Sequence, residues 1–223
     1  MRTAILVDAA FYLIRHRQLF GDDKHINGTD VANDLYRHCM RHISKDKDEL
    51  YRIYIYDSEP LQKRVQKPIS KKPYNFRNSS TYKFRKDFHK QIKKLPSFAL
   101  RLGTLDEKYG YWELKRPETI KKLVAKTITV DDLQDEDFRY TFKQKGVDIK
   151  IGLDIATLTH KKFVNKIILI SGDSDFVPAA KHARREGVFF QLDPMYHDIK
   201  EDLLEHIDRL RTSIGKQYIK KDN

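Results

Sequence analysis

The chain has 223 residues and carries 44 Lys and Arg against 32 Asp and Glu, a net charge of +12 with a pI near 9.5. Its length suits one α/β domain with an insertion, and its charge favours a polyanionic partner, either nucleic acid or an anionic membrane. Cys39 is the single cysteine, which excludes a disulfide framework within one chain and fits a cytoplasmic location. Asp8 and basic residues interrupt residues 1–20, so we expect no signal segment and no membrane contact.

Two strands with a helix between them are predicted in the first 60 residues. The runs TAILVD (3–8) and YRIYIYD (51–57) are apolar and each ends on an aspartate, as expected for strands of a buried parallel sheet. The stretch NGTDVANDLYRHCMRHI (27–43) has cap residues at its start and apolar residues at a spacing of four, which predicts an amphipathic helix. We expect His38 and His42 on the solvated face of that helix.

The positive charge is concentrated in residues 61–126, which contain 19 Lys and Arg but only 5 Asp and Glu. Aromatic residues are interleaved with the basic ones, and PSFALRLGTL (96–105) and YWELK (111–115) are predicted strands. Basic residues mixed with aromatics can hold phosphates and stack on bases. We therefore predict a basic, aromatic-rich elaboration at about 61–126, with these nucleic-acid-binding residues: Arg85, Lys86, Lys93 and Lys94.

The remaining chain alternates helices and strands. KGVDIKIGLDIATLTHKK (145–162) is a predicted helix with Asp148 as its cap and Asp154 in its middle. The predicted elements after it are a strand within 166–176, a helix at 175–187, a strand at 188–193 and an amphipathic closing helix at 197–210. This order predicts one α/β domain over 1–212, an open and mainly parallel sheet with helices on both faces, followed by a basic tail at 213–223.

Aspartates gather at one edge of the predicted sheet. Asp8, Asp57 and Asp173 follow strands, and ligands of open α/β sheets bind beyond the carboxyl ends of the strands. A single aspartate after a strand is usually a turn residue or a helix cap, but Asp173 and Asp175 together exceed the need of one cap. Packed carboxylates raise one another's pKa unless a hard cation such as Mg²⁺ or Mn²⁺ neutralises them. A metal site is therefore expected at this edge.

Three stretches also resemble a known family. ILVDAAFYL (5–13), KGVDIKIGLDIATL (145–158) and ILISGDSDFVPAAKHARREG (168–187) are similar to the NYN domain, the PIN-like ribonuclease fold that includes the LabA-like bacterial proteins. The resemblance covers most of 1–195. It implies a Rossmann-like PIN fold and Mg²⁺- or Mn²⁺-dependent RNA cleavage, with an endoribonuclease as the expected type. Many members have Gly and Asn after the first aspartate, where this chain has Ala9 and Phe11.

The motifs of the family carry its catalytic and metal-binding residues over to four positions: Asp8, Asp154, Asp173 and Asp175. The resemblance implies that a metal-oriented water attacks the phosphate and leaves 5′-phosphate and 3′-hydroxyl ends. RNA is then the expected partner, single-stranded or structured, and the sequence leaves monomer and homodimer open.

Two other functions are weighed against this one. A non-catalytic RNA-binding module would keep the basic segment but would have no use for the acidic residues. A haloacid-dehalogenase-type phosphatase also has an aspartate after its first strand, but it needs a second acid two residues later, where this chain has Ala10. A P-loop nucleotide hydrolase is excluded as far as motifs allow, because the chain lacks the glycine-lysine signature of that loop.

Overall fold

The computed structural model describes residues 1–22 and 27–215, so most of the predicted basic tail, 216–223, lies outside the described residues. Its centre is a seven-stranded sheet in the order β6-β5-β2-β1-β7-β8-β9. All neighbours in this sheet pair in parallel except β5 and β6, which are antiparallel. The strands are β1 (Arg2–Asp8), β2 (Glu49–Ser58), β5 (Phe98–Leu114), β6 (Phe138–Lys145), β7 (Lys166–Ile170), β8 (Phe189–Asp193) and β9 (Arg209–Leu210).

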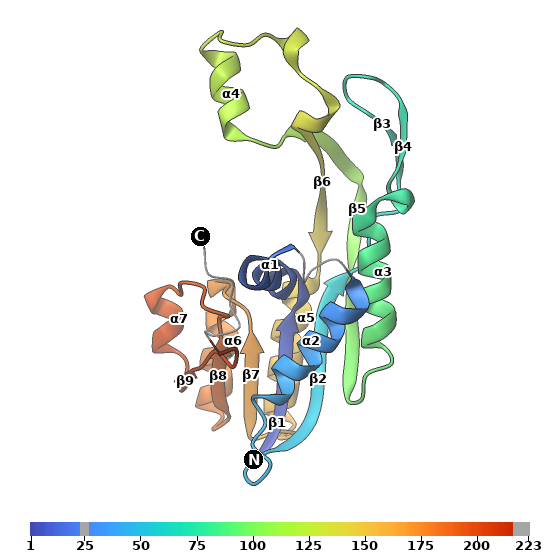
Figure 1. Cartoon of the computed structure of the whole chain (residues 1–223). Coiled ribbons are helices and arrows are strands. Elements are labelled where there is room, and N and C mark those ends of the chain that lie inside the picture. Colours follow the sequence, from blue (N-terminus) through green and yellow to red (C-terminus); the bar gives the residue numbers. More distant parts are fainter. Residues whose placement is uncertain (23–26, 216–223) are drawn as a thin grey trace.

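Helices cover both faces of the sheet, which confirms the predicted α/β class (Figure 1). One face packs against α1 (Ala9–Phe20), α2 (Gly28–Met40) and α3 (Ser80–Ile92). The other face packs against α5 (Val147–His160), α6 (Val177–Arg185) and α7 (Glu201–Glu205). The central strands are apolar on both faces: Ile5 belongs to the first core and Leu6 to the second, and both are fully buried. This double burial explains their continuous apolar runs.

The first and last helices differ from the sequence-based expectation. α1 begins directly after β1, where the Asp8 carboxylate caps it by accepting from the Phe11 N–H at 3.1 Å. The closing helix expected at 197–210 is only the short α7, and the chain then adds the edge strand β9. Gly146, with a φ of 81°, is the N-cap residue of α5, so Asp148 lies in the first turn of this helix and is not its cap.

An arm rises from one side of the sheet (Figure 1). We define the arm as residues 59–79 and 104–145. β5 pairs with β2 up to Gly103 and from Thr104 onward pairs with β6 alone. The arm also contains the hairpin β3 (Arg64–Gln66) and β4 (Pro73–Asn75), helix α4 (Pro117–Val124) and the short 3₁₀ turns η2 (Phe76–Asn78), η3 (Val130–Asp132) and η4 (Asp135–Asp137).

The arm coincides only in part with the elaboration predicted at 61–126. Residues 80–103 form α3 and the first part of β5, and both belong to the core. The strands predicted at 96–105 and 111–115 are two parts of the single long strand β5. The acidic stretch after Lys126 is the tip of the arm, where η4 contacts the hairpin: Asp135 accepts from the Ser70 hydroxyl at 2.6 Å.

Candidate active site

Strand ends at the carboxyl edge of the sheet bring four aspartates into a row. Asp57 lies near the end of β2, Asp8 ends β1, Asp173 follows β7 and Asp193 ends β8. From β1 the sheet grows to one side with β2 and β5, and from β7 it grows to the opposite side with β8 and β9. We call the point between β1 and β7, where the order of strands turns back, the chain reversal. Ligand sites of open α/β sheets lie at this kind of reversal. Asp8 and Asp173 flank it.

Asp8 is largely buried without a cationic partner. The pKa of its carboxyl is raised from 3.8 to about 6, mainly by burial and in smaller part by the nearby carboxylates of Asp148 and Asp57, while the Phe11 N–H acts in the opposite direction. Within the described part of the chain, no Lys, Arg or His forms an ion pair with Asp8. An acid in this environment gains from a cation that offsets its charge.

Four aspartates form a group that we call the acid cluster: Asp8, Asp148, Asp173 and Asp175. Burial raises the pKa of Asp148, and the charges of Asp173 and Asp175 add to this effect. Asp173 caps η5 (Ser174–Phe176): its Oδ1 accepts from the Asp175 N–H at 2.9 Å. The structure thus brings together three of the four predicted site residues and adds Asp148, which the sequence analysis had treated as a cap.

Asp154, the remaining predicted site residue, has other partners. Its Oδ2 accepts from the Tyr56 hydroxyl at 2.8 Å and lies 3.2 Å from Nε of Arg101. Asp154 comes six residues after Asp148 on α5, which corresponds to about 9 Å along the helix axis. α5 leads into β7 and so begins at the carboxyl edge of the sheet. Asp148 therefore lies closer to the carboxyl edge of the sheet than Asp154 does.

The two outer aspartates of the row are compensated. Asp57 is fully buried, with its Oδ1 2.9 Å from Nη2 of Arg85 and its Oδ2 2.7 Å from Nε2 of His89. Asp193 is also fully buried, and its Oδ2 lies 2.6 Å from Nε2 of His38 and 2.7 Å from Nε2 of His42. We call His38, His42 and Asp193 the histidine network. The expectation that the two histidines lie on a solvated face was wrong, because both are buried against Asp193 of β8.

The histidine network is also the one set of three His, Cys, Asp or Glu groups whose ligand atoms lie within 4.8 Å of one another in residues 1–22 and 27–215. Its short Nε2 to Oδ2 distances are those of charge-assisted hydrogen bonds. Ligands around one zinc ion at bond lengths of 2.0 to 2.2 Å would stand roughly 3.3 Å apart. Burial would raise the pKa of Asp193, but the hydrogen bonds from the two imidazoles hold it well below its usual range. The geometry fits a set of hydrogen bonds that connects the C-terminal end of α2 and the turn after it to β8.

The acid cluster is more open than that network. Its carboxylate oxygens do not meet three at a time within 4.8 Å among the described residues. All its donors are oxygens, which hard cations prefer. Mg²⁺ usually keeps several waters and takes one or two carboxylates plus substrate phosphates, so an open group of carboxylates is a suitable donor set.

Phe11 lies beside the acid cluster at the position where the family motif has Asn. Its ring packs edge to face on His197, with 5.9 Å between ring centroids. Both rings crowd Gly172, since a Cβ at that glycine would meet His197 at 2.7 Å and Phe11 at 2.8 Å. Gly172 therefore lets two rings approach the loop that carries Asp173, a role that the sequence pattern did not reveal.

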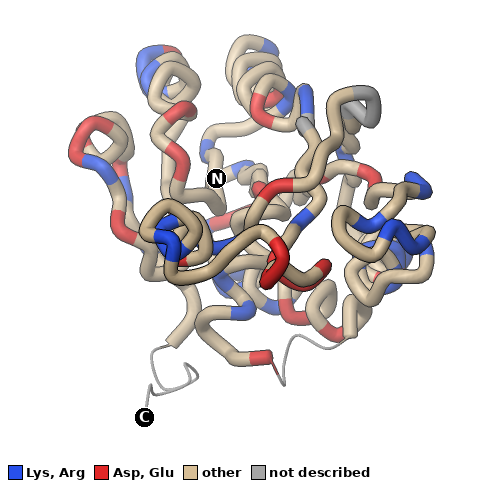
Figure 2. Tube along the Cα trace, turned by 90° about the horizontal axis from the view of Figure 1, so that it is seen from above, with Lys and Arg blue, Asp and Glu red and all other residues tan. Residues whose placement is uncertain are grey.

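The four predicted RNA-binding residues are spread along α3. Arg85 pairs with the buried Asp57, and Lys86 Nζ lies 3.4 Å from Glu59. Lys93 and Lys94 are exposed just after the helix ends, at the amino edge of the sheet and away from the acid cluster. Figure 2, which looks onto the carboxyl edge, shows Lys and Arg positions on all sides of the trace. Of the four predicted residues, two are therefore held in ion pairs and two lie away from the acid cluster.

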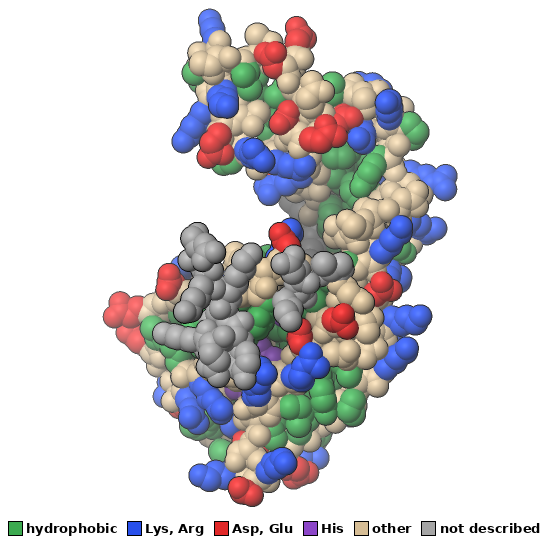
Figure 3. Space-filling model, in the orientation of Figure 1, with side chains coloured by type: hydrophobic (Ala, Val, Ile, Leu, Met, Phe, Trp, Pro, Cys, Tyr) green, Lys and Arg blue, Asp and Glu red, His purple; other side chains and the backbone are tan. Residues whose placement is uncertain are grey.

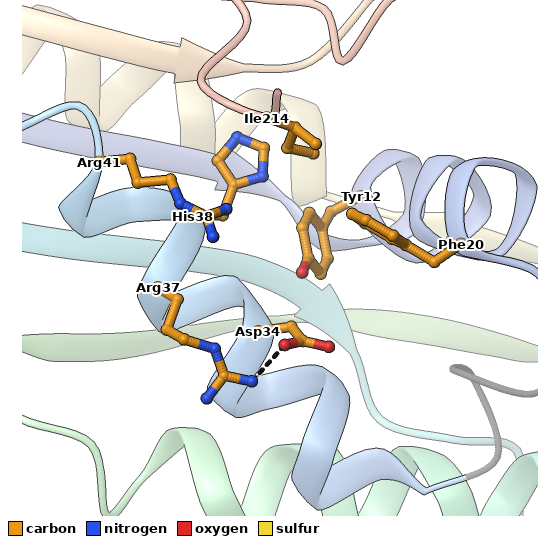
Figure 4. Close-up of a pocket in the computed structure, with 7 residues that line it drawn as sticks. All are labelled: Tyr12, Phe20, Asp34, Arg37, His38, Arg41 and Ile214. Carbon is orange, nitrogen blue, oxygen red and sulfur yellow. Dashed lines mark hydrogen bonds and ion pairs between the residues drawn. The ribbon is translucent and has the colours of Figure 1, made fainter. Parts of the chain in front are cut away.

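A cavity of about 190 Å³ lies between α1 and α2, on the face of the sheet that these helices cover (Figure 4). It is lined by Tyr12, Phe20, Asp34, Arg37, His38, Arg41 and Ile214. Nδ1 of His38 is buried without a hydrogen-bond partner there. None of the acid cluster lines this cavity, so it is separate from the carboxyl edge.

Comparisons with known proteins identify the family. The family model of the NYN domain matches residues 75–199, more than half of the chain, a span that includes Asp148, Asp154, Asp173 and Asp175 and begins after β1. A crystal structure of a protein of unknown function from Vibrio parahaemolyticus is similar, with 14% identity over 94% of this chain and 90% of that chain and a TM-score of 0.48. No curated protein matches. No helix in the described residues is long and apolar enough to cross a membrane. The chain belongs to the NYN domain family, within the PIN-like nuclease superfamily.

Proposed function

We propose that this protein is a Mg²⁺- or Mn²⁺-dependent endoribonuclease that acts on RNA in the cytoplasm and leaves 5′-phosphate and 3′-hydroxyl ends. The observation that supports this most is the uncompensated acid cluster at the chain reversal of an NYN-family sheet, where the pKa of Asp8 is raised to about 6. Structural aspartates at the same edge carry His or Arg partners, as Asp57 and Asp193 do. A carboxylate group left without such partners is suited to bind a cation.

The acid cluster would hold the cation. Asp8 is positioned by the Phe11 N–H, and Asp173 by its bond to the Asp175 N–H, so both carboxylates are oriented before any ligand arrives. A bound Mg²⁺ or Mn²⁺ supplies charge stabilisation on the phosphate oxygens and lowers the pKa of an attacking water. The cluster itself repels phosphate, so RNA binding and cation binding are expected to depend on each other.

Asp154 has a different part in this proposal from the one that the family resemblance implies. Its carboxylate joins the Tyr56 hydroxyl to the Arg101 guanidinium, which fixes α5 against β2 and β5. We propose that Asp148 contributes the carboxylate of α5 that meets the cation and that Asp154 keeps the helix in place. Asp8 and Tyr56 are registered partners of neighbouring strands, so the contact of Asp154 also supports the strand beside Asp8.

The test is an incubation of the purified protein with single-stranded and structured RNAs in Mg²⁺, Mn²⁺ or chelator, followed by analysis of the ends. We expect cleavage only with metal, with 5′-phosphate products. An Asp8→Asn, Asp173→Asn double variant should be inactive while still binding RNA. Cleavage that survives in this rigorously purified variant would place the activity elsewhere. An inactive parent protein that binds RNA would instead support the non-catalytic binding module. The observation that favours this alternative is Ala9 and Phe11, at positions where many family members have Gly and Asn.

A further inference from the structure

A cavity of about 270 Å³ lies where the arm joins the body, and aromatic rings form much of its wall. The rings come from three elements: Tyr74 and Phe76 from the hairpin side, Tyr82 from α3, and Tyr140 and Phe142 from β6. Figure 3 shows hydrophobic side chains at the surface near this junction. For scale, a cavity of roughly 150 Å³ accepts a benzene ring. The space is therefore large enough for a planar heterocycle.

The aromatic rings of the arm do not close into an ordinary core. In the described side chains of residues 59–79 and 104–145, the buried ones are Pro60, Leu61 and Leu133, and the five cavity aromatics all stay partly exposed. Part of the group is held rigidly, since Phe76 packs on Tyr140 at 5.2 Å and on Tyr74 at 5.0 Å between centroids. Tyr82 and Phe142 make no such ring contact among the described residues. Both line the cavity and are half-buried, so a ring that enters the cavity can contact them.

A cation forms part of the same wall. Arg85 lines the cavity, and its guanidinium is 2.9 Å from the buried Asp57 carboxylate and 19% exposed. This pairing fixes a planar, charged group that can stack on an aromatic ligand. The ammonium of Lys63 also lies 5.9 Å from the Tyr140 ring centroid. Aromatic faces next to cations suit a ligand that is both planar and attached to an anion.

The cavity is close to the acid cluster. Ser58, which lines it, is the last residue of β2, and Asp8 is registered with Tyr56 on that strand. Two residues along a strand and one strand across correspond to roughly 7 Å and 5 Å between backbones. A strand of RNA that crosses Asp8 can therefore reach the cavity with a neighbouring nucleotide.

We propose that this cavity, the base pocket, takes up one unpaired nucleobase of the RNA whose backbone crosses the acid cluster. The inference rests on the proposed function and makes its substrate more specific: the preferred RNA is single-stranded beside the cleavage site. A base in a duplex is stacked and paired, so it cannot enter without being extruded. The pocket thus selects for strand state through stacking, which every base can provide.

The test measures binding in the presence of chelator, so that it is independent of cleavage. The probes are an eight-nucleotide oligouridine and a blunt RNA duplex, each with a fluorescent end label, at fixed salt. In the Tyr82→Ala, Phe142→Ala variant we expect the single strand to bind roughly 5- to 150-fold more weakly. Duplex binding should stay within twofold. Tyr111→Ala is the matched control, because Tyr111 lies on the same arm, 56% exposed, and does not line the pocket.

A second measurement on the unaltered protein avoids any effect of the substitutions on folding. An oligouridine with a single 2-aminopurine should lose fluorescence on binding, since stacking on an aromatic ring quenches this base, and Tyr111→Ala should quench equally. Two results would overturn the base pocket. One is an equal loss of affinity for single strand and duplex in the Tyr82→Ala, Phe142→Ala variant, and the other is an absence of quenching at every position of the 2-aminopurine. Discrimination of strand state without any metal-dependent cleavage would leave the base pocket standing and reject the nuclease.

Discussion

Asp8 and Asp193 end two parallel strands of one sheet, yet their surroundings are opposite. Asp193 receives a hydrogen bond from the Met195 N–H at 2.8 Å and hydrogen bonds from two imidazoles, and the imidazoles keep its pKa low in spite of complete burial. Asp8 receives only backbone N–H groups and faces other carboxylates, so burial raises its pKa to about 6. The same residue type at the same edge is thus a satisfied structural anion in one place and an uncompensated one in the other.

Position at the carboxyl edge alone therefore does not define the site. Helix α3 supplies Arg85 and His89 to Asp57, while helix α2 and the turn after it supply His38 and His42 to Asp193. The aspartates between them, at the chain reversal, receive no side-chain cation from any described helix. The helices thus neutralise the outer positions of the row and leave the central ones open for a ligand.

The largest expected effect is on stability, from Asp193→Ala. Removing this carboxylate leaves two buried imidazoles and the Met195 N–H without their acceptor, so the free energy of unfolding should fall by about 3 to 5 kcal/mol. Urea denaturation at pH 7 measures it. Asp175→Ala, which removes an exposed carboxylate, should change the free energy by less than about 0.5 kcal/mol.

The same measurement distinguishes a hydrogen-bonded network from a metal centre. We expect chelator to leave the urea midpoint of the unaltered protein in place. A midpoint that chelator lowers to that of Asp193→Ala would show that the histidine network holds a metal ion.

The next effect concerns the two aspartates of α5. Asp148→Asn should lower the rate of metal-dependent RNA cleavage roughly 100- to 1000-fold, the range seen when one electrostatic contact to a reacting group is lost. Asp154→Asn should lower the rate less than tenfold and should instead reduce stability, because Asn cannot keep the charge-assisted contact with Arg101. Single-turnover rates and urea denaturation of both variants provide the check. The reverse order of the two rates would return Asp154 to the metal site, as the family resemblance implies.

A moderate effect is expected on the pH dependence of stability. The folded protein holds a proton on Asp8 up to about pH 6, whereas the unfolded chain releases it near pH 3.8. The contribution of Asp8 to the free energy of unfolding should therefore fall as pH rises from about 4 to about 6, by up to about 3 kcal/mol in metal-free buffer. His42 acts the other way, because burial lowers its pKa and protonation in acid opposes folding.

The difference between the unaltered protein and Asp8→Asn isolates the contribution of Asp8. Asp8→Asn should be the more stable protein at pH 7 without metal, and the two should converge near pH 4. Added Mg²⁺ should stabilise the unaltered protein alone. Parallel curves across this pH range would mean that the carboxylate of Asp8 is compensated in solution.

The smallest effect concerns cations outside the row of aspartates. Lys83→Gln, Lys86→Gln should reduce the slope of log affinity for single-stranded RNA against log salt by up to about 1.4, since each phosphate contact contributes about 0.7. Lys93→Gln, Lys94→Gln, just after α3 and roughly 10 Å beyond Lys86 along the helix axis, should leave the slope unchanged. A salt titration of oligouridine binding in chelator measures both. Equal slopes for the two variants would mean that RNA follows the whole length of the helix.

Much of the fold could be predicted from apolar patterning. The runs at 3–8, 51–57 and 166–170 are buried on both faces, and this leaves a continuous signal in the sequence. Helix α1 was not foreseen, because the interpretation of its residues turned on the absence of a signal segment and passed over Asp8 as a cap. The closing helix was overestimated because β9 pairs with β8 through a tertiary contact that no local pattern records.

The sequence predicted an acidic site at the carboxyl edge, but it did not predict every aspartate that belongs to it. Strand-end positions indicated Asp8 and Asp173, but the partners that neutralise Asp57 and Asp193 come from helices distant in sequence. Asp148 could have been found from the direction of α5: a helix that returns to a parallel strand begins at the carboxyl edge, so its first turn is nearest to the site. The spread of basic residues along α3 required the three-dimensional arrangement.

The outer part of the arm, residues 115–137, is carried by the strand pair β5 and β6, in which Leu114 is the registered partner of Phe138. The two ends of the segment 115–137 are therefore neighbours, and a two-residue turn of the Asn-Gly type could replace the whole segment without a gap in the backbone. The tip with α4 is in this sense a detachable module. Insertions or exchanges at this point could alter what the protein recognises while the acid cluster, the sheet and both cores keep their sequence.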